Sequence, residues 1–437
     1  MELIGIQMNM LNRTIAPEIK NAVDFDLHLK PYEKFTLDNG VEVYTINAGV
    51  EEVLQLELVF AAGNSYETQN LVAATTNHLL KNGTSTKTAF DINEHFEFYG
   101  SYLNRTCANE TATISLHTLS KNLPILLPVI TEILTDASFP EEELNIFKQN
   151  SKQKLSVNLK KCDFVANRLI DAQLYGENHP YGKYTHMEDF DVLTRDALVK
   201  YYDDFYRHGK CIIFVAGKLS KNIFEQLNEQ FGKLPFTAWN PQKVVRPFEN
   251  TSIDNPKSEI INDKEGVQGA IRIARNFPNR HHPDFQKLQV LNNLFGGFFG
   301  SRLMDNIRED KGYTYGIHSY LQNHVEQSAW MISTEAGRDV CAPTIKEVYY
   351  EMEQLRNELV EEDELLLVKN FMIGSILGDL DGPFQIIGRW KNYILNGTDD
   401  SYFYSAIQSI KSVTAEELKE LANKYLHPGY FHELVVI

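Results

Sequence analysis

A chain of 437 residues is too long for one ordinary hydrophobic core, so we expect at least two sizeable domains. It has 42 basic and 59 acidic residues, and the formal net charge of -17 disfavours binding to nucleic acid or to an anionic membrane. The sequence has no run of about eighteen apolar residues and no leader with a basic start and an apolar centre, so we expect a cytoplasmic protein without membrane insertion. Its four cysteines lie far apart, which predicts buried thiols instead of a disulfide framework or a zinc ribbon.

The predicted elements, taken in chain order, occur twice at a spacing near 220 residues. A strand and turn over residues 56–67 precede a helix over 70–84, and the order strand, loop, helix, glycine returns over 269–303. The later members of the repeat are helices with acidic first turns, helices with a threonine start and closing strands. They begin at Phe139 and Leu359, at Val192 and Ser412, and at Cys211 and Phe431, and the members of each pair are 220 residues apart.

This repeat predicts an α+β fold made of two homologous domains. Each domain is expected to have a mixed, largely antiparallel sheet with helices packed on one face. We place the N-terminal domain at residues 1–232 and the C-terminal domain at 260–437. The segment 233–259 between them contains four prolines and little hydrophobic periodicity, which is typical of an extended linker.

Seven short stretches carry a resemblance to a known family. In order, and over nearly the whole chain, they are similar to the insulinase/pitrilysin family of zinc peptidases, the inverzincins, in its short two-domain bacterial form. The resemblance implies two α/β-roll domains and a zinc motif, H-x-x-E-H, on a helix that ends at a Gly-Thr turn. The stretches are LDNGVEV, FAAGNSYE, NGTSTKT, EFYGSYLN, FPEEEL, ENHPYG and SRLMDNIREDKGYTYG.

The positions of this zinc motif are mostly occupied by residues that cannot bind zinc. The resemblance puts the first histidine at Ala74, the glutamate at Asn77 and the second histidine at His78, and it puts the later glutamate ligand at or beside Lys154. Residues 145–161 contain no carboxylate. Because a zinc site requires about three protein ligands and only one remains, we expect this chain to bind no metal, and His78 to be a packed or hydrogen-bonded side chain.

A second pair of family residues is intact. Members of the family use an arginine and a tyrosine from the C-terminal domain, in the pattern R-E-x-x-G-x-x-Y, to contact the substrate and the oxyanion. Here the pattern is REDKGYTY, which implies this role for Arg308 and Tyr315. The alternative is that Arg308 pairs with neighbouring carboxylates and that Tyr315 merely begins a strand.

An edge strand is the other element that the resemblance assigns to substrate. Family members lay an extended peptide against an exposed strand by β-augmentation. The corresponding residues in this chain are Tyr102, Leu103, Asn104 and Arg105.

The absence of zinc ligands beside an intact arginine and tyrosine resembles the non-catalytic subunits of two-chain members. We therefore expect a zinc-less subunit that pairs with a zinc-bearing relative and encloses peptide substrates, with zinc only in the partner. The leading alternative is a structural or assembly subunit without a role in proteolysis. A stand-alone peptidase that uses another site is the third interpretation, but the sequence contains no second cluster of ligands.

Overall fold

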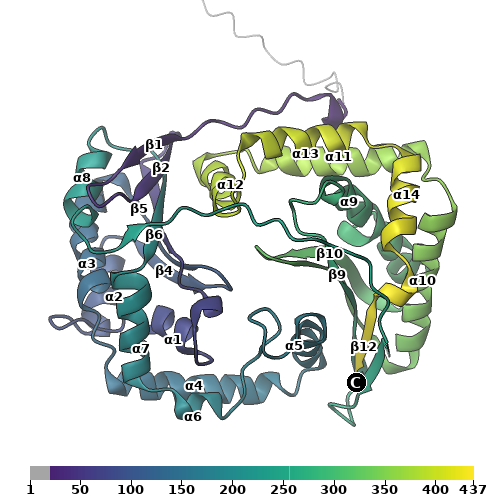
Figure 1. Ribbon diagram of the computed structural model, residues 1–437, viewed down its shortest axis with the longest axis horizontal. Coiled ribbons are helices and arrows are strands. Elements are labelled where there is room, and N and C mark those ends of the chain that lie inside the picture. Colours follow the sequence, from purple (N-terminus) through teal and green to yellow (C-terminus); the bar gives the residue numbers. More distant parts are fainter. Residues whose placement is uncertain (1–19, 255) are drawn as a thin grey trace, which may run out of the picture.

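The computed structural model describes residues 20–254 and 256–437, and it contains two β-sheets, one in each half of the chain (Figure 1). The first sheet has the order β1-β2-β6-β3-β5-β4, with β7 beside β6, and the second has the order β10-β11-β9-β12-β8. The strands are β1 Glu33–Thr36, β2 Glu42–Asn47, β3 Val53–Phe60, β4 Tyr102–Cys107, β5 Ala112–Leu119, β6 Lys210–Gly217, β7 Thr237–Ala238, β8 Lys257–Ile260, β9 Gln268–Phe277, β10 Thr314–Asn323, β11 Ser328–Gly337 and β12 His432–Val436.

Most neighbouring strands in both sheets are antiparallel, and the parallel pairs are β2 with β6, β6 with β7, and β12 with β8. The prediction of an α+β fold with mixed, largely antiparallel sheets is confirmed. In each half, the strand after the threonine-capped helix lies inside the sheet: β6 pairs with β2 and β3, and β12 pairs with β8 and β9. Among the described residues, no helix combines the length and apolar character needed to cross a membrane.

The helices of the two halves also follow the predicted repeat. Thr194 and Thr414 cap α7 and α14 through their side chains, and α4 and α11 begin with three acidic residues each. The helices of the N-terminal half are α1 Val72–Leu79, α2 Ala89–Phe98, α3 Leu123–Asp136, α4 Glu141–Asn158, α5 Cys162–Tyr175, α6 Asp189–Val192, α7 Arg195–Tyr202 and α8 Ile223–Phe231. Those of the C-terminal half are α9 Phe285–Asn292, α10 Cys341–Asn357, α11 Glu362–Gly378, α12 Pro383–Leu395, α13 Asp400–Ser412 and α14 Ala415–Tyr425.

Two helices are shorter in the structure than the sequence predicts. The helix expected over residues 70–84 is α1, which starts only after Leu71 because that residue has a left-handed backbone with φ 73°. The helix expected over 286–303 is interrupted: α9 is followed by a π-helical segment, η5 Asn293–Gly297, and by a separate π-helical segment, η6 Met304–Asp310. Gly296 has φ -162° and ψ 15°, so the helical path ends there.

Each half contributes one helix that packs on the sheet of the other half, and the two helices occupy equivalent places in the repeat. Helix α5 of the N-terminal half packs against β9 and β12 of the second sheet, while α12 of the C-terminal half packs against β2 and β6 of the first (Figure 1). The apolar face of α5 includes Val165, Ile170 and Leu174, which are buried against the second sheet. Burying side chains of this size stabilises a fold by about 1.5–3 kcal/mol each. Each sheet therefore depends on the other half of the chain for part of its cover.

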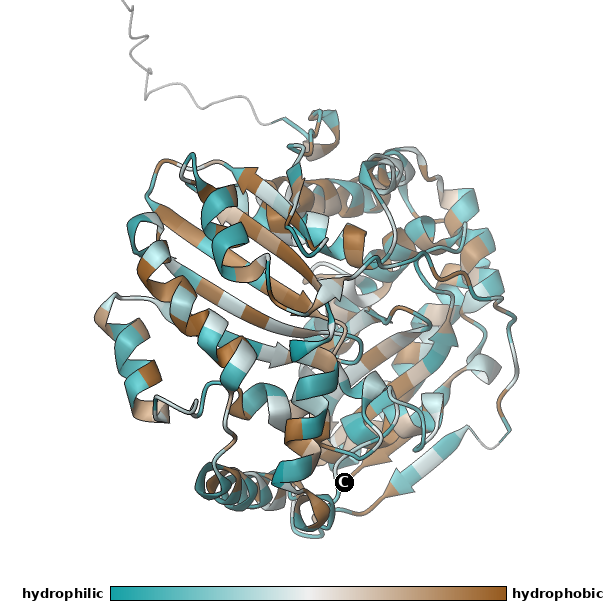
Figure 2. Cartoon of the chain, turned by 60° about the vertical axis from the view of Figure 1, so that its left-hand side comes forward, coloured by the Kyte–Doolittle hydropathy of each residue, from teal (hydrophilic) through white to brown (hydrophobic). Residues whose placement is uncertain are grey.

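The contact of α12 with the first sheet combines apolar and ionic interactions. The Trp390 ring packs edge-on against Tyr32, and its indole N–H donates to the Lys30 carbonyl at 2.8 Å. The Lys391 ammonium lies 2.6 Å from the carboxylate of Glu57, a buried side chain on β3. Apolar residues follow the strands of this sheet (Figure 2), and every residue of β6 after its first is buried, as expected for a strand covered on both faces.

Candidate functional site

Helix α1 holds the three motif positions in the arrangement that their spacing predicts. Ala74 and His78 are four residues apart and both are exposed, so they share one face of the helix. Asn77 is turned about 100° from His78 around the helix, and it is buried and donates a hydrogen bond from its amide nitrogen to the Tyr206 hydroxyl at 3.1 Å. An amide in this position acts as a structural tie between α1 and the segment after α7, and it cannot serve as a base near neutral pH.

His78 and Lys154 line the same cavity, of about 370 Å³, between α1 and α4. The His78 ring packs against Phe147 of α4 with ring centroids 5.0 Å apart. One carboxylate, that of Glu143, also lines this cavity and accepts a hydrogen bond from the Asn82 amide at 2.7 Å. The sequence reasoning missed Glu143 because it lies in the first turn of α4, three turns before Lys154 and outside the family spacing.

The positive charges around His78 disfavour the binding of a cation beside its ring. Arg105 of β4 donates a hydrogen bond to the His78 carbonyl, and Lys81 follows one turn later on the chain. Partial burial, followed by the charges of Arg105 and Lys81, lowers the pKa of His78, so the ring is neutral at pH 7. Burial lowers the pKa of Arg105 itself to about 10, which leaves its guanidinium charged.

The donor set does not fit a zinc ion. Within residues 20–254 and 256–437, no three His, Cys, Asp or Glu side chains are grouped so that they could hold a metal. Ala74 offers no donor atom, and the Lys154 ammonium would repel Zn²⁺. These positions therefore present an uncharged imidazole packed on an aromatic ring, with cationic side chains nearby.

Arg308 and Tyr315 lie together at the surface of the C-terminal half. The Arg308 guanidinium lies 4.6 Å from the Phe299 ring centroid and 5.6 Å from that of Tyr315, so it lies beside two aromatic rings. A carboxylate oxygen of Glu309 lies 3.1 Å from Nη1, without the geometry of a hydrogen bond. Phe299 was not singled out in the sequence, although it follows the glycine-rich stretch LFGGF directly.

A β-bulge explains why Tyr315 projects from the sheet. The register of β10 against β11 shifts between Thr314 and Ile317, and the Thr314 hydroxyl accepts from the Gly316 N–H and donates to the Glu335 carbonyl. Such a bulge re-aims side chains next to it. The Tyr315 side chain is 92% exposed, with its ring free to contact another molecule.

The expected edge strand is present. Strand β4 includes Tyr102, Leu103, Asn104 and Arg105; it pairs with β5 on one side and is the last strand of the first sheet. Tyr102 is exposed and Leu103 is buried, as in a strand with one face on the core. Helix α1 lies against this strand, so the sheet edge and the helix that carries Ala74 and His78 are neighbours.

The structure does not join all the predicted site residues into one cluster. Ala74, His78, Lys154 and β4 belong to the N-terminal half, whereas Arg308 and Tyr315 belong to the C-terminal half. Among the described residues, no hydrogen bond, ion pair or aromatic contact links one group to the other. Within the described chain, Arg308 and Tyr315 therefore make no such contact with the positions of the zinc motif.

Two homologous α+β halves, each with a mixed sheet and packed helices, define the class of fold. Comparison with known families supports this class. Residues 42–183 match the model for insulinase (peptidase family M16), and residues 193–372 match the model for the peptidase M16 inactive domain. The chain belongs to the insulinase family, peptidase family M16.

Relatives of the chain match it over most of its length. It is 24% identical over 409 residues to YmxG of Bacillus subtilis, which is described as an uncharacterized zinc protease. The aligned region covers 92% of this chain and 98% of YmxG. A peptidase M16 inactive domain from Pseudomonas fluorescens superposes with a TM-score of 0.79 at 23% identity, covering 93% of this chain and 98% of the other. A protease from Helicobacter pylori superposes with a TM-score of 0.82 at 17% identity, covering 94% and 100%. These structures establish the fold.

Proposed function

We propose that this chain is the zinc-less subunit of a heterodimeric zinc endopeptidase, and that a zinc-bearing relative of the same family supplies the metal. The observation that carries the proposal is the combination of zinc-motif positions that keep one ligand type, His78, with an arginine and a tyrosine held at the surface. Ala74 and Lys154 remove two ligands, and Asn77 replaces the base with a buried amide. Among the described residues, no group of His, Cys, Asp or Glu side chains could hold the zinc that activates water in the family's chemistry.

Arg308 and Tyr315 would contact the substrate in the partner's site. A guanidinium offers several N–H donors in one plane and a phenol offers one O–H donor, so together they can hold a peptide carbonyl and the charge that develops on its oxygen. Phe299 limits the positions open to Arg308, which reduces the entropy lost when the guanidinium engages a substrate. The free edge of β4 would hold an extended peptide through main-chain hydrogen bonds.

The test is a peptidase assay on this chain alone, on the pair with a co-expressed zinc-bearing relative, and on the pair that carries Arg308→Ala. We expect no activity from the isolated chain, activity from the pair, and a loss of about 10²–10³ in kcat from Arg308→Ala, as for removal of one oxyanion donor. Arg302→Ala is a matched control, because Arg302 pairs with Glu364 through two hydrogen bonds and does not contact Tyr315. Unchanged activity in the Arg308 variant would remove the substrate-contact role.

The second candidate is a structural or assembly subunit. Its supporting observation is the exchange of α5 and α12, which would keep the fold rigid with or without catalysis. Copurification distinguishes the two functions: a stable complex with a zinc-bearing relative and activity in that complex favour the first. A complex that forms without any peptidase activity favours the second.

A further inference from the structure

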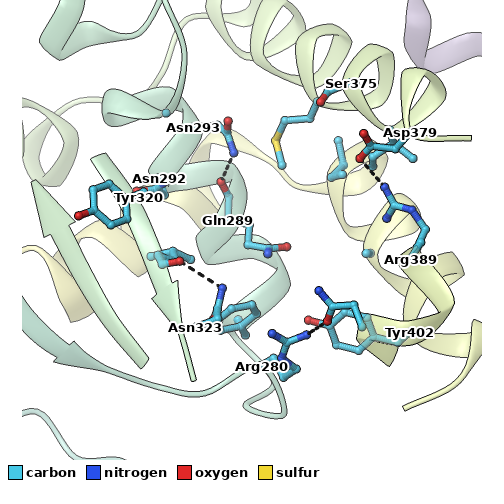
Figure 3. A pocket seen from close by; sticks show the side chains of 18 of the residues that line it. Arg280, Gln289, Asn292, Asn293, Tyr320, Asn323, Ser375, Asp379, Arg389 and Tyr402 are labelled. Carbon is cyan, nitrogen blue, oxygen red and sulfur yellow. Dashed lines mark hydrogen bonds and ion pairs between the residues drawn. The ribbon is translucent and has the colours of Figure 1, made fainter. Parts of the chain in front are cut away.

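A second cavity, of about 670 Å³, lies within the C-terminal half between α9, β10 and the helices α11 to α13 (Figure 3). It shares no lining residue with the cavity beside His78, and neither Arg308 nor Tyr315 lines it. Its lining is rich in side-chain amides, which can both donate to and accept from a peptide backbone. These amides are Gln289, Asn292, Asn293, Asn323, Gln385 and Asn392.

The charged residues that line this cavity leave one positive charge without a partner. They are Arg280, Asp379 and Arg389. Arg389 lies across the cavity from the α9 amides (Figure 3), and its guanidinium donates to the Asp379 carboxylate at 2.7 Å. That pair is neutral overall, so the net charge of the lining is that of Arg280. A positive interior cavity stands out in a chain with a formal net charge of -17.

Arg280 makes one hydrogen bond with the rest of the described protein, from Nη1 to the side-chain oxygen of Asn392 at 2.5 Å. Its Nε is buried and has no partner among the described residues. Burial lowers the pKa of Arg280, while Tyr402 and Tyr393 act in the opposite direction, and Arg280 forms no ion pair with another described residue. A half-buried guanidinium with a buried Nε and no ion-pair partner among the described residues is costly unless a ligand supplies the anion.

Arg280 also lines a neighbouring cavity of about 760 Å³, located between the two halves and the extended linker. The two cavities share Arg280, Asn323, Gly388 and Asn392, so this side chain stands at their junction. Trp239 and Pro241 of the linker and Tyr66 of the N-terminal half line the second cavity. A ligand bound at the junction could therefore extend from the C-terminal half into the space between the halves.

We propose that Arg280, at the junction of these two cavities, binds a carboxylate, and that the amide-lined cavity beside it holds the group to which the carboxylate is attached. A carboxylate matches the planar fork of a guanidinium, and its single charge balances the one uncompensated cation of the lining. The carboxylate can be the C-terminus of a peptide or belong to a small free acid. This site goes beyond the proposed function, because it requires neither the partner subunit nor Arg308.

Calorimetric titration of the isolated full chain tests the proposal. The probes are an N-acetylated, otherwise uncharged heptapeptide with a free C-terminus, the same peptide as a C-terminal amide, succinate, and inorganic phosphate. We expect at least one carboxylate probe to bind, and the peptide acid, if it is the source, to bind at least about tenfold tighter than its amide. Succinate binding without peptide binding identifies a small acid as the source, and peptide binding that succinate cannot displace identifies a C-terminus.

Variants assign the binding to Arg280. Arg280→Gln is expected to abolish the carboxylate preference, and Arg280→Lys, which keeps the charge without the fork, to weaken it severalfold. Arg207→Gln is the matched control, since Arg207 is exposed and pairs with Asp203 within the π-helical segment Asp203–Arg207 that follows α7. The proposal is overturned if no carboxylate probe binds the wild-type chain, if phosphate binds in preference, or if the carboxylate preference survives in Arg280→Gln. The first two outcomes need no variant, so they stand even if Arg280→Gln fails to fold.

Discussion

Two substitutions, Ala74→His and Lys154→Glu, should give this chain a zinc site. Ala74 and His78 share the exposed face of α1, and Lys154 lines the same cavity as His78, so the double variant would present two imidazoles and one carboxylate. Three such ligands and an open fourth position are typical of catalytic zinc. The double variant also removes the ammonium from the cavity. We expect one zinc per chain in the variant and none in the wild type.

The stabilisation that accompanies binding can be estimated. A ligand at a hundred times its Kd stabilises the folded state by about 2.7 kcal/mol. In a domain of about 150–250 residues, each kcal/mol of stabilisation raises Tm by about 2–4 °C, so zinc binding should raise Tm by roughly 5–10 °C. Mass spectrometry under native conditions counts the bound zinc, and thermal denaturation with and without zinc gives the shift in Tm. Gln153→Glu in place of Lys154→Glu is the control, because Gln153 adjoins Lys154 on α4 but does not line the cavity.

Zinc in the variant should not restore hydrolysis. Asn77 still occupies the position of the base, and adding Asn77→Glu replaces the bond to the buried Tyr206 hydroxyl with a buried carboxylate, at a cost of about 1–3 kcal/mol. If the double variant takes up no zinc, or if the Gln153 control binds as well as the double variant, the inferred arrangement of α1 and α4 is wrong.

Three further predictions concern other parts of the chain. Phe299→Ala should lower the kcat of the active pair severalfold, because Arg308 loses one of its two aromatic neighbours, and Phe299→Tyr should preserve it in the same peptidase assay. Ile170→Ala on α5 should lower the free energy of unfolding by about 2–5 kcal/mol in urea titrations, since this fully buried side chain packs on the other half. Burial, followed by the charge of His179, lowers the pKa of His324 to about 4, below its usual 6.5, so the native ring stays neutral while the unfolded chain takes up a proton. The free energy of unfolding should therefore fall by about 2 kcal/mol between pH 6.5 and pH 5, and it should fall less in the His324→Phe variant.

Each of these has a contrary result. Equal kcat in Phe299→Ala and wild type would mean that the ring does not position Arg308. If Ile170→Ala lowers the free energy of unfolding no more than Gln173→Ala, a change at an exposed residue of α5, then α5 is not fixed between the halves. An identical decline in stability for wild type and His324→Phe below pH 6.5 would assign the acid sensitivity to other groups.

Local patterns were enough to predict the elements and the repeat. The threonine caps, the acidic first turns and the apolar strands are each determined by residues close together in sequence, and the 220-residue spacing placed them in two similar halves. The arrangement of Ala74 and His78 on one face followed from helical geometry alone. These features depend on short-range chemistry, which a single sequence contains.

Features that depend on tertiary packing were not predictable. The apolar face of α5 indicates burial, but nothing in its pattern says that it covers the sheet of the other half. Glu143 lines the cavity beside His78 only because α4 packs beside α1, and Phe299 contacts Arg308 only because the chain turns after Gly296. Arg280 follows a strand and precedes two histidines in sequence, and its place at the junction of two cavities could be seen only once α12 and the linker were in place.

The central claim, that this chain lacks the metal and a relative carries it, is tested most directly by counting zinc in the purified heterodimer and in each chain alone. We predict one zinc per heterodimer, none in this chain alone, and no change in the zinc content or activity of the pair on His78→Ala. One zinc in the isolated chain, lost on His78→Ala, would contradict the account.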